Sequence, residues 1–276
     1  MSKEDNKVWY KVKFKQIQPI HIGYNKYGVI NETRLFIPGQ TMWGALTNAY
    51  FKNTGNYNEE LFENITCFYP MIENEVLYPK FKDGEFFLGD LSEKEFRKEF
   101  VTTYISTAIN PQTLSAKDES LHEIDVILPK NIYWVGYIGL DISNFEDILK
   151  NLKNVFIGGD TRYGLGLIEL EKEDINQAPA SEEMHYKFVK KGKIQIQEKN
   201  SDEGKIQEEI LDEVKNLIDN KNLTNFVKFN DLKDVDEIEG KLELLAEFDF
   251  KQNIPKIKEE SGLYISVGST IKFKFS

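Results

Sequence analysis

The first part of the chain alternates apolar and polar side chains with a period of two. The alternation covers residues 8–20, VWYKVKFKQIQPI, and predicts a half-buried β-strand. A glycine-marked loop and a short extended piece follow, and the Pro38–Gly39 pair then ends the extended pattern. The next apolar residues, Met42, Leu46 and Tyr50, recur at helical spacing. The chain is therefore predicted to begin with a strand, a loop and a helix.

A second strand–helix–strand unit is predicted further along the chain. Residues 131–142, NIYWVGYIGLDI, are strand-like, residues 143–155 have helical spacing with Ser143 as the N-cap, and residues 165–173 are again strand-like. Two such units with a region between them fit a ferredoxin-like α+β domain. We predict this domain over residues 1–172.

The region between the two units, about residues 55–130, is predicted to be a long insertion. It is irregular and rich in aromatic residues, with short strands predicted at 74–81 and 84–89. The polar stretch 173–183 lacks periodicity and is predicted to be a linker. Beyond it, residues 184–276 combine a strand pair, a long helix and further strands, which predicts a second, smaller α+β domain. An alternative is that this part is a degenerate second ferredoxin-like unit.

The composition is that of an ordinary soluble globular protein. The 276 residues are 40% hydrophobic, the mean hydropathy is -0.47, and no apolar run approaches the roughly 20 residues needed to cross a bilayer. We expect no membrane contact and, without a secretory signal, a cytoplasmic location. A single cysteine, Cys67, and three scattered histidines form neither a disulfide framework nor a zinc motif. Neither a metal nor another cofactor is expected.

The charge of the chain limits how it could bind nucleic acid. The net charge is -11, from 46 acidic and 35 basic residues. Phosphate binding depends mainly on lysine and arginine, so a protein that binds nucleic acid over its whole surface is excluded. Any nucleic-acid site must be a local patch.

One motif is the glycine-rich stretch 157–170, IGGDTRYGLGLIEL. Glycine is needed where φ is positive or where backbones approach closely, so this stretch predicts a tight loop with exposed amides that can bind a phosphate. It is neither a Walker A loop, which would end in lysine and Ser/Thr, nor a dinucleotide fingerprint, whose glycines precede a helix. The alternative is a bulge and turn required only by packing. Asp160 within it would cap the turn or, alternatively, bind a metal.

A second motif is FIPGQTMWGALTNAYF, residues 36–51. Its proline–glycine pair stops a strand and leaves Gln40 and Thr41 at a helix N-terminus, where free amides favour an anion. The alternative is a simple turn and helix cap, with Trp43 and Leu46 in the core.

These motifs occur in an order that resembles the RAMP superfamily of CRISPR-associated proteins. The matching segments are His21-Ile22-Gly23, residues 37–46 (IPGQTMWGAL) and residues 158–166 (GGDTRYGLG). Residues 107–127 also resemble the inserted β-hairpin thumb of the family. The resemblance covers about residues 8–170.

The resemblance implies a ferredoxin-like (RRM-like) fold and a non-catalytic subunit of a type III CRISPR effector complex in antiviral defence. Its implied partners are the guide RNA backbone, other RAMP subunits, the large polymerase-like subunit and, indirectly, the target RNA. Such a subunit leaves specificity to base pairing. The implied RNA-binding residues are Gly158, Gly159, Thr161, Arg162, Tyr163, Gly164, Gly166, Gly39, Gln40, Thr41 and His21.

The chain departs from the family pattern at several positions. Trp43 and Thr47 stand where many members have basic residues, and residues 24–33 contain no aspartate of the kind found in target-cleaving members. We therefore expect no cleavage by this chain. His21 as a general base is the alternative to a structural histidine. Two other functions remain open: a RAMP endoribonuclease that processes guide RNA or cleaves target RNA, and an acidic protein–protein adaptor.

Overall fold

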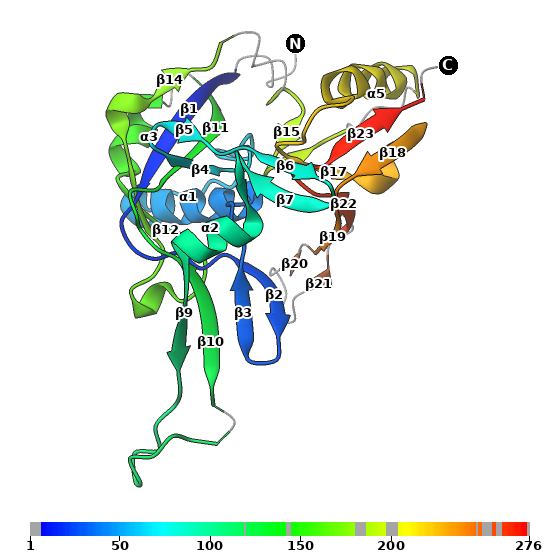
Figure 1. The fold of residues 1–276 in the computed structure, drawn as a ribbon. Coiled ribbons are helices and arrows are strands. Elements are labelled where there is room, and N and C mark those ends of the chain that lie inside the picture. Colours follow the sequence, from blue (N-terminus) through cyan, green and yellow to red (C-terminus); the bar gives the residue numbers. More distant parts are fainter. Residues whose placement is uncertain are drawn as a thin grey trace.

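The computed structural model describes residues 7–118, 120–141, 145–179, 186–196, 204–246, 248–249, 256–257 and 261–274. They form a mixed α+β fold with many short strands and few helices (Figure 1). Within this part of the chain, no helix combines the length and apolarity needed to cross a bilayer.

The largest sheet is antiparallel and is built mainly from the N-terminal 177 residues. Its strands are β1 (Lys7–Gln16), β4 (Tyr69–Ile72), β5 (Glu75–Val76), β11 (Tyr133–Asp141), β12 (Asn154–Phe156), β13 (Leu167–Leu170) and β14 (Asn176–Gln177). They lie in the order β12-β13-β1-β11-β4-β5, and β14 also pairs with β1. The long strands β1 and β11 pair along nearly their whole length, from Lys7 opposite Asp141 to Lys15 opposite Tyr133.

Helices α1 (Gly39–Thr54) and α3 (Phe145–Asn151) belong to the core on one face of this sheet. Val12 and Phe14 of β1 share that core with apolar residues of α1, whereas Trp9 packs in a separate cluster with Tyr137 and Val189. The alternating residues Val12 and Phe14 thus bury one face of the strand, and Trp9 is buried on the other face. The predicted first strand and first helix are confirmed. Ser143, the predicted N-cap of the second helix, lies outside the described residues.

The insertion contains more regular structure than the sequence predicted. It includes the small sheet of β6 (Pro79–Lys82), β7 (Glu85–Leu88) and β8 (Leu91–Ser92), followed by helix α2 (Glu93–Phe100). Helix α2 was not predicted. It begins with a capping box, in which Ser92 accepts from the Glu95 amide while the Glu95 side chain accepts from the Ser92 amide.

A hairpin of β9 (Val101–Ser106) and β10 (His122–Ile127) projects from the body of the molecule (Figure 1). It forms a sheet with β2 (Gly23–Tyr27) and β3 (Ile30–Thr33) in the order β2-β3-β10-β9. A hairpin was predicted at residues 107–127, and the structure places its first strand before that range. Its connecting segment has exposed apolar side chains, including Ile109 and Leu114.

The C-terminal part has its own sheet and helix. Its elements are β15 (Val189–Lys190), β16 (Lys193–Ile194), α5 (Gly204–Ile218), β17 (Phe226–Lys228), β18 (Val235–Glu239), β19 (Leu242–Leu245), β20 (Phe248–Asp249), β21 (Lys256–Ile257), β22 (Gly262–Ile265) and β23 (Thr270–Phe273). Strands β16 and β17 pair in parallel as neighbours on either side of the α5 crossover. Val214 and Ile218 of α5 pack in a cluster with Ile265 and Ile271.

The two parts of the chain also pack on each other. Phe226, Tyr264 and Val267 belong to the same core cluster as the β1 and α1 residues. The predicted linker contributes β14 to the large sheet, and its last residues, 180–183, lie outside the described residues. The division into domains 1–172 and 184–276, and the degenerate second copy, stay predictions.

Candidate nucleic-acid interface

The N-terminus of α1 has fewer free amides than the sequence suggested. The helix follows Pro38 directly and has no side-chain cap. The amides of Thr41 and Met42 donate to the Pro38 carbonyl at 2.9 and 3.1 Å. The Gly39 amide hydrogen-bonds the buried Cys67 thiol, whose pKa is raised to about 12 by burial. Of these first amides, those of Gly39 and Gln40 have no backbone partner in the described part of the chain.

Gly39 is required by a close contact with the C-terminal part. A Cβ atom at this position would lie 2.3 Å from the Gly192 nitrogen, in the turn between β15 and β16. The amides of Lys191 and Gly192 in this turn donate to the carbonyls of Glu63 and Ile65, both at 2.7 Å. The β15–β16 turn is therefore held against the start of α1. Lys191 of this turn and Lys193 of β16 lie close to the helix start as a result.

The glycine-rich loop is held by close backbone contacts. Gly158 has a φ of +80°, and a Cβ there would lie 2.1 Å from the His21 carbonyl oxygen. Gly166 has a φ of +88°, and a Cβ there would lie 2.2 Å from the Ile157 oxygen. The amides of Gly159 and Gly166 donate to the carbonyls of His21 and Pro19 at 3.0 and 2.8 Å. The expectation of free amides at these two glycines is therefore wrong, because packing uses both.

Residues 162–164 of this loop are exposed. Thr161–Tyr163 form a short 3-10 turn, in which Arg162 is exposed and Tyr163 is 84% exposed. Gly164 has open space around it. Arg162 has no ion pair with another described residue. The assignment of these residues to RNA stays a prediction.

His21 is held within the fold. Its Nδ1 lies 2.7 Å from the Asp125 carbonyl oxygen, which can only accept, so Nδ1 donates and the contact fixes the ring. Nearby, Asp160 Oδ2 lies 3.8 Å from His122 Nε2 on β10. Among the described residues, no group of three or more His, Cys, Asp or Glu side chains is placed to hold a metal ion.

The structure brings the two sequence motifs together at one cavity of about 600 Å³, the basic cavity. Of the predicted residues, Gln40, Thr41, Gly158 and Gly159 line it, whereas Gly39, Thr161, Arg162, Tyr163, Gly164, Gly166 and His21 do not. The remaining walls come from α1, the end of β12 and the C-terminal part, including Asn48, Phe156 and Phe226. The start of α1 and the glycine loop are thus neighbours in space, although more than 110 residues separate them.

The charged side chains that line the basic cavity are Arg34, Lys191 and Lys193. No acidic residue of the described chain lines it, although the whole chain has a net charge of -11. Lys193 is 3% exposed, with its Nζ 4.9 Å from the Tyr264 ring centroid. The site is a local concentration of positive charge, and side chains supply more of it than backbone amides do.

Lys191 lies beside Trp43, the residue that stands where many RAMP proteins have a basic side chain. Its Nζ is 3.9 Å from the centroid of the Trp43 ring and 3.5 Å from Glu63 Oε1. Trp43 is fixed in turn by a 2.8 Å hydrogen bond from its Nε1 to the Glu59 carbonyl. A lysine from the C-terminal part therefore takes a place beside Trp43 on α1. Glu63 offsets part of its charge.

Arg34 is the third cation, and it is nearly buried. Its Nη2 lies 2.7 Å from Glu243 Oε2, and the two side chains are 12% and 8% exposed. Its guanidinium carbon lies 4.5 Å from the centroid of the Tyr24 ring. Its Nη1 is buried without a hydrogen-bond partner in the described part of the chain. Buried donors of this kind are rare in folded proteins, so a water molecule or a ligand is expected to supply the acceptor.

Sequence reasoning missed all three cations. Residues 186–193, YKFVKKGK, contain four lysines in an otherwise acidic chain, and this local signal could have indicated a basic turn. Arg34 has no comparable local signal, since its role depends on Glu243 and on a cavity formed by distant segments.

The sequence and the fold were compared with known proteins. The family model described as the RAMP superfamily matches residues 13–169, which is more than half of the chain. The chain belongs to the RAMP superfamily. Comparison with curated proteins gave no match.

The fold was also compared with solved structures. A chain of a type III-B Cmr-beta complex bound to cognate target RNA and AMPPnP matches with a TM-score of 0.55 and 14% identity, covering 95% of this chain and 86% of that one. A chain of the Cmr-beta complex bound to cognate target RNA matches with a TM-score of 0.43 and 12% identity, covering 59% of this chain and 96% of that one. The first of these matches shows that this RAMP protein shares its mixed α+β fold with a Cmr subunit.

Proposed function

We propose that this RAMP protein is a non-catalytic RNA-binding and assembly subunit of a type III CRISPR effector, and that it binds the guide RNA backbone in the basic cavity. The observation that supports this most is the lining of that cavity. In a strongly acidic chain, its charged lining among the described residues consists of Arg34, Lys191 and Lys193. A groove lined by cations and no carboxylates can bind the phosphates of a nucleic acid. Such contacts do not depend on the base sequence.

We infer further that the large sheet has a ferredoxin-like core. Its four central strands lie in the order β13-β1-β11-β4 and are antiparallel throughout. Helix α1 lies in the connection from β1 to β4, and α3 lies in the connection from β11 to β13. This is the strand–helix–strand, strand–helix–strand connection of the ferredoxin-like motif. The start of α1 and the glycine-rich loop, which both line the basic cavity, then belong to the two strand–helix–strand connections.

The proposed partners are the guide RNA, other RAMP subunits, the large polymerase-like subunit and, indirectly, target RNA. The projecting β9–β10 hairpin supports a role in assembly, because Ile105, Ile109 and Leu114 on it are more than 60% exposed. Exposed apolar side chains on a projecting hairpin are available for contact with another protein. The absence of catalysis is supported by the lack of aspartate in residues 24–33. The alternatives remain a RAMP endoribonuclease and an acidic adaptor.

Lys191→Gln is expected to weaken binding of single-stranded RNA about tenfold, because a hydrogen bond to a charged group contributes about 1.5 kcal/mol. The slope of log affinity against log salt should also fall by about one, as for the loss of one phosphate contact. Fluorescence anisotropy at a series of salt concentrations measures both quantities. The wild-type protein should leave the RNA uncut.

The matched control is Lys187→Gln, in the same lysine-rich stretch. The Lys187 side chain is 64% exposed, lies 3.8 Å from Glu213 and does not line the basic cavity. If both variants bind RNA equally, or if wild-type affinity does not depend on salt, the basic cavity is not the RNA site. Cleavage of repeat RNA or target RNA by the wild type would favour the endoribonuclease, and the absence of RNA binding would favour the adaptor.

A further inference from the structure

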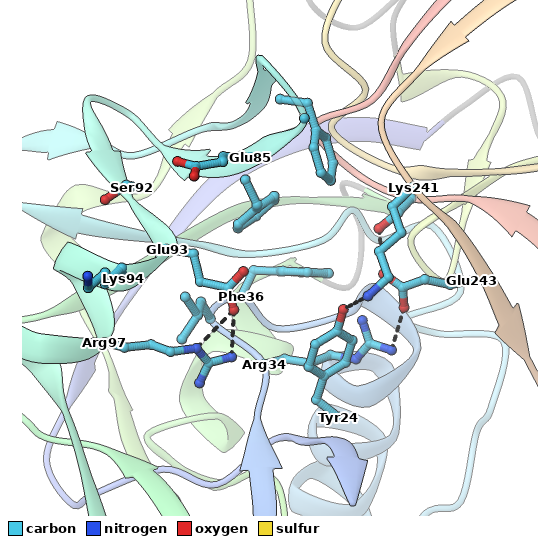
Figure 2. A pocket seen from close by; sticks show the side chains of 15 residues that line it. Tyr24, Arg34, Phe36, Glu85, Ser92, Glu93, Lys94, Arg97, Lys241 and Glu243 are labelled. Carbon is cyan, nitrogen blue, oxygen red and sulfur yellow. Dashed lines mark hydrogen bonds and ion pairs between the residues drawn. The ribbon is translucent and has the colours of Figure 1, made fainter. Parts of the chain in front are cut away.

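A second cavity, of about 670 Å³, is also lined by Arg34 (Figure 2). We call it the aromatic cavity. It lies between the β6–β7 hairpin and the start of α2 on one side and β19 on the other. Phe36, Phe81 and Phe86 line it, and the Phe81 and Phe86 rings meet edge to face with centroids 5.5 Å apart. Its size is in the range of small-molecule sites.

Arg34 belongs to the walls of both cavities. Figure 2 shows its guanidinium beside the Tyr24 ring, with Glu243 holding it from the opposite strand. Lys241 Nζ also lies 4.6 Å from the centroid of the Tyr24 ring, and it hydrogen-bonds the Tyr24 hydroxyl. Tyr24 and Arg34 therefore form a fixed stacked pair at the boundary between the two cavities.

The charged side chains of the two cavities differ. Those that line the basic cavity are all cationic, whereas the aromatic cavity has carboxylates beside its cations: Glu85, Glu93 and Glu243 with Arg34, Lys94, Arg97 and Lys241. Carboxylates repel a phosphate, but they accept hydrogen bonds from the N–H groups of a base edge. Aromatic rings and an arginine plane are the surfaces on which proteins stack unpaired RNA bases.

We propose that the aromatic cavity binds one unstacked base of the RNA strand whose backbone lies in the basic cavity, with Arg34 between the base and the backbone. This rests on the proposed function, because the strand must first occupy the basic cavity. The buried Nη1 of Arg34, which has no partner among the described residues, would then receive an acceptor from the nucleotide. The base is held by stacking and so need not be of one kind.

The test compares Phe86→Leu with Phe51→Leu. Leucine keeps most of the apolar volume, so folding is retained while the ring is lost. Phe51 is 44% exposed on α1 and lines neither cavity, which makes it the matched control. Phe86→Leu should lower the affinity for single-stranded RNA about fivefold or more without changing the salt slope, since stacking on an aromatic ring involves no counterion release. RNA containing 4-thiouridine should crosslink to Tyr24, Phe81 or Phe86 in the wild type.

The outcomes distinguish this inference from the proposed function. If wild-type RNA binding depends on salt and on Lys191, but Phe86→Leu behaves like Phe51→Leu and no crosslink falls in the aromatic cavity, the base site is overturned and the proposed function stands. If Phe86→Leu weakens assembly with a sibling subunit and leaves RNA affinity unchanged, the cavity is a protein contact and the base site is again overturned. If the wild type binds no RNA, both proposals fail.

Discussion

Gly158→Ala is expected to destabilise the protein by about 3 kcal/mol. The added Cβ would lie 2.1 Å from the His21 carbonyl oxygen, a distance that requires the backbone of the loop or of residue 21 to move. Overpacking of this kind typically costs about 1–3 kcal/mol, and a φ of +80° adds about 1 kcal/mol for any residue with a side chain. Urea denaturation, extrapolated to water, gives the change in the free energy of unfolding.

Gly164→Ala is the matched control for this prediction. Gly164 lies in the same loop with a φ of +83°, but nothing lies within 4 Å of a Cβ built there. Only the conformational cost of about 1 kcal/mol remains. Equal losses for the two variants would show that backbone conformation, rather than the contact with residue 21, explains why the loop contains glycine.

Arg34→Met is expected to cost about 3 kcal/mol of stability. Glu243 is 8% exposed and would keep its hydrogen bond from the Ser266 hydroxyl, at 2.6 Å, but would lose its cation. An unpaired buried carboxylate is strongly unfavourable, and breaking such pairs typically costs about 3–5 kcal/mol. The double variant Arg34→Met, Glu243→Gln should recover most of this loss, because the amide keeps the hydrogen bond and removes the charge. Thermal and urea unfolding of the three proteins measure the effect.

The exposed pair of Lys80 and Asp90 gives the comparison. Its atoms lie 3.0 Å apart, yet the side chains are 35% and 97% exposed. Lys80→Met should therefore change stability by less than about 1 kcal/mol. If Arg34→Met costs no more than Lys80→Met, Arg34 is not a structural partner of Glu243.

Local patterns in the sequence were enough to predict the central elements. The alternation of Val12 and Phe14 with lysines predicted β1, and the spacing of Met42 and Leu46 predicted α1. These patterns are reliable because each element buries one regular set of side chains in the same core. Helix α2 was missed although its signal was present, since Ser92 and Glu95 have the spacing of a capping box.

The candidate site was predictable only in part, for a physical reason. Pro38–Gly39 and Gly158–Gly159 are recognisable as turns from local chemistry, and the resemblance to RAMP proteins connected the two motifs. The cations come from other segments. Lys191 and Lys193 reach the site because the β15–β16 turn packs on Gly39, and no local pattern encodes that contact between distant parts of the chain. Packing of the glycine-rich loop on residues 19 and 21 uses the Gly159 and Gly166 amides, which the sequence suggested were free.

Protection of a single introduced thiol by RNA tests the central claim, that the basic cavity binds an RNA backbone, most directly. Cys67 gives a silent background, because it is buried and its pKa is raised to about 12, so little thiolate forms at neutral pH. Asn48→Cys places a thiol on the wall of the basic cavity, and Asn56→Cys places one on the exposed segment after α1, outside it. Bound RNA should slow modification of the first thiol and not the second, and added salt should remove the protection. If bound RNA changes the modification rates of both thiols by the same factor, or changes neither, the account is contradicted.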